Sequence, residues 1–128
     1  MAYINKKRTW HECTDKNILS VYNEVMAETK RLYPEYFDCD IKFYIDSSTK
    51  RLGSCRYSPK KETLINKWGY AAQYGDIRFN EIVILLSKYV TDTESVRKVL
   101  VHEAGHLVTP REHHSYNWKI RADKIGAK

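Results

Sequence analysis

The chain of 128 residues is 42% hydrophobic and 30% charged, which is typical of one soluble domain with a single modest core. It has no apolar run near the ~18 residues that span a membrane, no secretory signal at its start, and no C-x-x-C pair among its three cysteines. We therefore expect a cytoplasmic protein without membrane contact or disulfide framework, and its net charge of +6 makes DNA a candidate partner through a basic surface.

Residues 1–13 are polar and basic, and we interpret them as an N-terminal arm that precedes a single domain over residues 14–128. Thr14 or Asp15 can cap a helix that ends near Leu32. The apolar residues of this segment recur at helical spacing, at Ile18, Val21, Tyr22, Val25 and Leu32. We expect this helix to serve packing and to carry no chemistry of its own.

Three segments after this helix are candidates for strands. Ile41 to Ile45 places apolar side chains on one side, which predicts a strand. Leu52 to Tyr57 can return beside it, and Gly53 indicates a bulge or a close approach of another backbone. Glu62 to Trp68 can add a short third strand.

A further apolar segment comes before the central helix. Asp76 to Asn80 alternates, with Ile77 and Phe79 on one side, and this pattern predicts a strand. Glu81 to Leu86 is more continuously apolar and fits either a buried strand or a buried helical turn.

The central helix is predicted from Glu94 to Val108. Thr91 and Glu94 fit a capping box at its start, and Pro110 disfavours helical geometry at the residue before it, so the helix should end near Val108. Gly105 weakens the helix, and close approach of another backbone would explain it. The apolar stripe consists of Val96, Val99, Leu100, Ala104, Leu107 and Val108.

Ser115 to Ile125 is predicted to form a closing helix that ends at Gly126, with Trp118, Ile120 and Ile125 packed inward. The whole set of segments predicts a small α+β domain. In it, a short mixed sheet packs against an N-terminal helix, the central helix and a C-terminal helix.

The central helix contains an H-E-x-x-H pattern formed by His102, Glu103 and His106. Two histidines four residues apart lie on one helical face, about 6 Å apart along the axis, and can share one Zn²⁺. Glu103 is then placed to accept a proton from water activated by the metal. The pattern therefore predicts a catalytic metal site.

A catalytic zinc site usually has three protein ligands and one open position. The third ligand must come from outside the motif, and Glu112, His113 and His114 are candidates soon after the break at Pro110. His11 is distant in sequence, and we expect it to be an ordinary surface histidine.

The chain resembles the SprT-like metalloproteases, in which H-E-x-x-H is followed by a histidine and an aromatic residue on the next helix. Four stretches carry the resemblance: HEAGH with His114 to Trp118, Gly53 to Cys55, Ile77 to Asn80, and Ile125-Gly126. The resemblance implies a zincin-like core with His114 as third ligand and Trp118 packed behind it. Ser115 replaces the usual glycine, which leaves His113 as an alternative ligand, and the cysteine-rich ribbon of many relatives is not present in this sequence.

The resulting hypothesis is a zinc peptidase that cleaves proteins associated with or crosslinked to DNA, as the resemblance implies. Glu103 would be the base, and Ile77, Arg78, Phe79 and Asn80 would bind an extended substrate by strand addition, although the same residues fit an ordinary sheet strand equally well. Three alternatives stay open: an ImmA/IrrE-like regulatory peptidase with Glu112 as a ligand, a DNA-binding module with structural zinc, and a metal-free scaffold.

Overall fold

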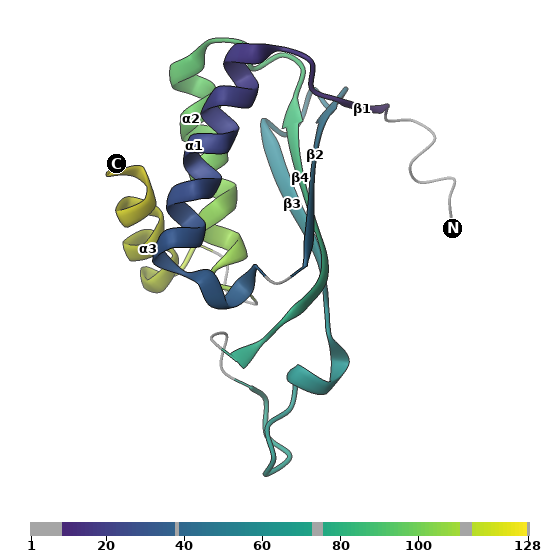
Figure 1. Ribbon diagram of the computed structural model, residues 1–128, viewed down its shortest axis with the longest axis vertical. Helices are drawn as coiled ribbons and strands as arrows, with labels where there is room; N and C mark the ends of the chain where they lie inside the picture. Colours follow the sequence, from purple (N-terminus) through teal and green to yellow (C-terminus); the bar gives the residue numbers. More distant parts are fainter. Residues whose placement is uncertain (1–8, 38, 73–75, 111–113, 128) are drawn as a thin grey trace.

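The computed structural model describes residues 9–37, 39–72, 76–110 and 114–127. In these residues, three α-helices lie on one side of a four-stranded mixed sheet (Figure 1). The α+β class that the sequence predicts is therefore confirmed. The helices are α1 (Lys16–Leu32), α2 (Thr93–Leu107) and α3 (Tyr116–Gly126), and the strands are β1 (Trp10–Glu12), β2 (Asp40–Asp46), β3 (Gly53–Pro59) and β4 (Phe79–Ser87).

The sheet has the strand order β1-β2-β4-β3. Strands β2 and β4 are parallel, whereas β1 pairs with β2 and β3 pairs with β4 in antiparallel register. Strand β4 is therefore internal, and its residues from Ile82 to Ser87 are all buried. Burial on both faces accounts for the continuous apolar run. The segment from Glu81 to Leu86, which fitted either a strand or a helical turn, is therefore a strand.

The start of β4 differs from the prediction. The strand begins at Phe79, and the side chains of Ile77 and Phe79 are 1% and 0% exposed in the core. The Arg78 amide donates to Thr63 Oγ1 at 3.0 Å, and the Arg78 carbonyl accepts from the Lys60 amide at 2.8 Å. Strand β3 pairs with β4 as far as Phe79, whereas β2 pairs with β4 only from Glu81 on. The buried side chains and the engaged Arg78 backbone do not favour substrate addition at Ile77, Arg78, Phe79 and Asn80, which stays a prediction.

The predicted short strand over Glu62 to Trp68 is also wrong. A 3₁₀ turn, η3 (Lys61–Thr63), occupies its first part, and a single bridge joins Ile65 to Ala71 beyond it. Asn66 explains the turn that follows: its Oδ1 accepts from the amides of Trp68 and Tyr70 at 2.9 and 3.0 Å. An asparagine side chain that bonds the backbone two residues ahead favours a turn over a strand.

Helix α1 begins as the sequence predicts. Asp15 is its N-cap, and Asp15 Oδ1 accepts from the amides of Asn17 and Ile18 at 2.8 and 3.1 Å. On the sheet side of the helix, Tyr22 stacks on Phe43 of β2, with ring centroids 4.2 Å apart. A second short turn, η2 (Pro34–Tyr36), follows the helix and brings Tyr36 into the core at 0% exposed.

The N-cap of helix α2 lies one residue after the predicted one. Asp92, rather than Thr91, caps it by accepting from the Ser95 amide at 2.9 Å, and Glu94 instead pairs with Lys98 at 3.3 Å. The helix ends at the predicted place, with Val108 as C-cap. It packs against α1, α3 and β3, so the H-E-x-x-H motif lies at the centre of the fold.

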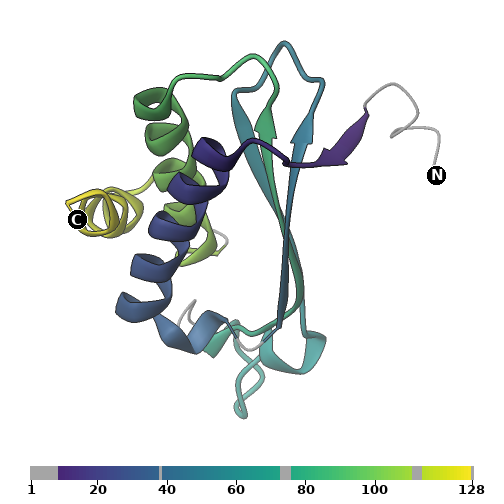
Figure 2. The same cartoon turned by 45° about the horizontal axis from the view of Figure 1, so that its top comes forward.

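The layers determine what surrounds the motif. Helix α3 begins after its N-cap Ser115 and lies on the side of α1 and α2 away from the sheet (Figure 2). Strand β1 forms the sheet edge opposite β3 and pairs with β2. The last residues of the predicted N-terminal arm therefore form a strand. The three cysteines are half-buried thiols that form no disulfide with one another. No described helix is long and apolar enough to cross a membrane.

Candidate metal and catalytic site

Three histidines converge at the middle of α2. His102 and His106 lie one turn apart on this helix, and His114 comes just before α3. The Nε2 atoms are 3.2 Å apart for His102 and His106, 3.2 Å for His106 and His114, and 3.0 Å for His102 and His114. The other two candidates for the third position, Glu112 and His113, lie outside the described residues.

The triangle of nitrogens fits a divalent metal ion. Four ligands arranged tetrahedrally at ~2.0–2.1 Å from Zn²⁺ are about 3.3 Å from one another, within a few tenths of the measured separations. Hydrogen bonding alone cannot satisfy the cluster, because a neutral imidazole has one N–H and one lone pair, and three Nε2 atoms cannot all donate and accept in a ring. The three histidines could therefore hold a metal ion.

The surroundings favour the neutral imidazole that a metal requires. Burial, and then the nearby charge of His114, lower the pKa of His102. A depressed pKa leaves the lone pair of Nε2 free at neutral pH, and the neutral ring is the form that binds metal.

Trp118 of α3 supports all three rings. Its ring centroid lies 4.9 Å from His102, 5.5 Å from His106 and 4.6 Å from His114, and its Nε1 donates to the His102 carbonyl at 3.2 Å. Gly105 makes this contact possible: a Cβ there would lie 2.8 Å from Trp118 Nε1. The close approach expected at Gly105 is therefore real, but side chains of α3 make it rather than a backbone.

Glu103 points from α2 toward the sheet. It is 7% exposed, and its carboxylate accepts a hydrogen bond from the Cys55 thiol of β3. Burial raises the pKa of Glu103 to about 7, although the Cys55 hydrogen bond and the positive charge of Arg51 act in the opposite direction. Burial, followed by the charge of Glu103, in turn raises the pKa of the Cys55 thiol.

A comparison with protein families adds to this geometry. The model of the SprT-like family matches residues 16–128. The chain belongs to the SprT-like family. Its fold and its histidine cluster fit the metallopeptidase type of domain that this family represents. Neither the curated proteins nor the solved structures compared with this SprT-like chain gave a match.

Sequence reasoning missed two neighbours of Glu103 in this SprT-like domain. Cys55 was noted only as part of a strand, and Arg51 was not noted at all. No local signal could have revealed them, because both reach Glu103 across the interface between α2 and β3, about fifty residues away along the chain. Gly53 is a partial exception: the expected close approach occurs, with a hypothetical Cβ only 2.4 Å from Val99 Cγ1 of α2.

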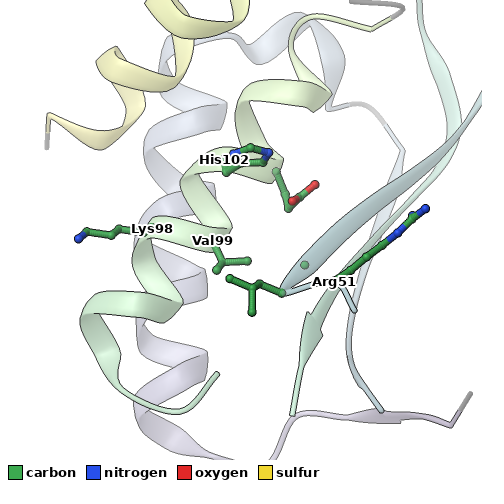
Figure 3. A pocket seen from close by; sticks show the side chains of 7 residues that line it. Arg51, Lys98, Val99 and His102 are labelled. Carbon is green, nitrogen blue, oxygen red and sulfur yellow. The ribbon is translucent and has the colours of Figure 1, made fainter. Parts of the chain in front are cut away.

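A cavity of about 320 Å³ opens beside these residues, between α2 and the start of β3 (Figure 3). Glu103 and His102 form the part of its wall that lies next to the metal site, and Val99 and Leu52 form an apolar part. The candidate site of the SprT-like domain therefore has a histidine cluster, a buried carboxyl group and an open space that meet at one place.

Proposed function

We propose that this chain is a zinc-dependent peptidase with a zincin-like core, in which His102, His106 and His114 hold the ion. The observation that carries the proposal is the convergence of three Nε2 atoms within 3.0–3.2 Å of one another, one residue from a buried glutamate. A donor set of three histidines suits Zn²⁺ and leaves one position of a tetrahedral site for water or substrate.

Zn²⁺ held by the three imidazoles would supply Lewis acidity, which lowers the pKa of water toward ~7 and polarises the carbonyl of the scissile bond. Glu103 is the proposed general base: it takes the proton of the attacking water and later gives it to the leaving amine. Burial raises the pKa of this carboxyl group in the metal-free protein, and a more basic carboxylate is a better acceptor for the proton of water. The Cys55 thiol orients the carboxylate, and Trp118 holds the three rings.

Strand β3 is the proposed binding edge for the substrate backbone. In the described part of the chain it is the last strand of the sheet, and the outer edge of such a strand can pair with an added strand. It is also the strand against which α2 packs, and its Cys55 contacts Glu103. An extended peptide that adds to this edge would pass beside the catalytic carboxyl group with little dependence on sequence.

Proteins bound or crosslinked to DNA are the proposed natural substrates. The net charge of +6 supports this choice, because a basic surface attracts a polyanion over several ångströms and raises the rate of encounter. The salt dependence of DNA affinity measures this contribution directly.

Metal analysis together with a protease assay tests the proposal. We expect one zinc ion per chain and cleavage of an unstructured protein, with and without single-stranded DNA. Glu103→Gln should abolish cleavage and keep the metal, whereas His114→Ala should lose both. His11→Ala is the matched control, because this exposed histidine lies on β1 away from the cluster.

The alternatives predict different outcomes of the same assay. Stoichiometric zinc and DNA affinity without proteolysis would favour a structural zinc module. Zinc well below one ion per chain would favour a metal-free scaffold. Proteolysis that persists in the Glu103→Gln variant would refute the assignment of the base.

A further inference from the structure

We propose that the cavity between α2 and the start of β3 receives the side chain of one residue that flanks the cleaved bond, and that Arg51 makes it select an acidic side chain, glutamate in particular. This inference rests on the peptidase function proposed above. It adds a preference for one kind of substrate residue, which neither the histidine cluster nor the family implies.

The cavity has the size and position of a side-chain subsite. Its volume of about 320 Å³ is at the small end of the ~300–1,000 Å³ found for ligand pockets, and it suits one side chain better than a larger ligand. Glu103 and His102 line it, so a side chain bound there belongs to a residue next to the reacting carbonyl.

The inner wall of the cavity is apolar. Val99 faces it from α2 (Figure 3), and Leu52, the residue before β3, also lines it. Leu52 is 63% exposed, so its side chain is accessible to a ligand that enters the cavity. Each methylene group buried against such a wall improves affinity by about fourfold, so a side chain with an aliphatic stem is favoured over a short one.

The rim of the cavity is cationic. Arg51 and Lys98 extend outward on either side of Val99 (Figure 3). Lys98 pairs with Glu94 at 3.3 Å, whereas the Arg51 guanidinium makes no hydrogen bond or ion pair with a described residue.

Arg51 is therefore the cation that remains for a ligand. Glu94 neutralises Lys98, so the guanidinium of Arg51, whose charge also acts on Glu103, is the group at the rim that can attract an acidic side chain. A side chain that has both an aliphatic stem for the apolar wall and a carboxylate for the rim is that of glutamate.

Peptide cleavage kinetics test the inference. The cleaved bonds of an unstructured protein are first mapped by mass spectrometry, and three peptides are then made with Glu, Gln or Lys at the preferred flanking position. Glutamine has the shape of glutamate without its charge, so this pair isolates the electrostatic part. Because an exposed ion pair is weak, we expect kcat/KM to be about two- to fivefold higher for Glu than for Gln, and lowest for Lys.

Variants at the rim give the decisive comparison. In the Arg51→Gln variant, kcat/KM should be equal for the Glu and Gln peptides. In the Arg51→Glu variant, the ratio of kcat/KM for the Glu peptide to that for the Lys peptide should fall by about tenfold, mainly through KM. Lys50→Glu is the control, since it makes the same change in net charge at an exposed neighbour that does not line the cavity.

The two proposals fail differently. If the zinc-loaded protein cleaves no peptide at all, the peptidase function is wrong and the subsite is wrong with it. If it cleaves but shows no preference for Glu, or if Arg51→Glu and Lys50→Glu behave alike, only the subsite is refuted.

Discussion

Replacing Glu103 by Gln should stabilise the metal-free protein at alkaline pH. The side chain is 7% exposed, and burial raises its pKa from the ordinary 4.5 to about 7. An acid whose pKa is raised by folding binds its proton more tightly in the native state than in the unfolded chain. The native state therefore loses stability as pH rises from 4.5 to 7, and the loss is complete above the folded pKa.

The size of the effect follows from the same shift. One unit of pKa difference corresponds to ~1.4 kcal/mol, so ionised Glu103 lowers the free energy of unfolding by about 3 kcal/mol at pH 8. Glutamine has a similar shape and no charge, so the Gln variant lacks this loss. The free energy of unfolding of the variant minus that of the wild type should therefore be about 3 kcal/mol larger at pH 8 than at pH 4.5.

Urea unfolding in the presence of a chelator, at half-unit steps from pH 4.5 to 8.5, measures this difference. Titrating histidines affect both proteins and largely cancel in the comparison. Glu94→Gln is the control on the same helix, because its side chain is 81% exposed and the same change of charge to amide there removes no buried carboxylate. If the Glu103→Gln and wild-type curves run parallel from pH 5 to 8, burial of Glu103 is not costly and the reasoning fails.

Three further substitutions test the packing of the site. Gly53→Ala would place a Cβ 2.4 Å from Val99 Cγ1 and should cost ~1–3 kcal/mol in urea unfolding, with Val99→Ala restoring most of the loss in the double variant. Trp118→Phe removes the donor to the His102 carbonyl and should weaken zinc binding by about tenfold in a chelator competition; unchanged affinity would contradict a supporting role. Asp15→Ala removes two hydrogen bonds at the α1 N-terminus and should lower stability by ~1 kcal/mol, without effect on zinc affinity.

Features that depend on nearby residues were predictable from the sequence. Asp15 and Ser115 cap their helices through side-chain bonds to amides two or three residues ahead, and such short spacings are visible in the sequence. The H-E-x-x-H spacing brings His102 and His106 together for the same reason. Even here the precision is limited, since Thr91 and Asp92 are both good caps and only the backbone decides between them.

Features that depend on pairing across the chain were not predictable. The alternation at Ile77 to Asn80 is the same for an edge strand and for the entry to an internal one, and only the strand order distinguishes them. Similarly, the Cys55–Glu103 contact depends on how β3 lies against α2. The strand order is therefore the reason why we propose β3, rather than the start of β4, as the substrate edge.

The histidine cluster and the buried glutamate oppose folding for related reasons, and one cation relieves both. The three imidazoles must stay neutral to lie within 3.0–3.2 Å of one another, and the carboxylate of Glu103 loses hydration. A divalent ion attracts all four groups in their deprotonated forms, so its stabilising effect should be larger at pH 8 than at pH 6.

Thermal unfolding with and without zinc measures this coupling. A ligand at 100 times its Kd stabilises the native state by about 2.7 kcal/mol, and the resulting rise in Tm should be present in His11→Ala and absent in His114→Ala. An equal rise in His114→Ala would mean that zinc acts elsewhere, and the site proposed here would lose its third ligand.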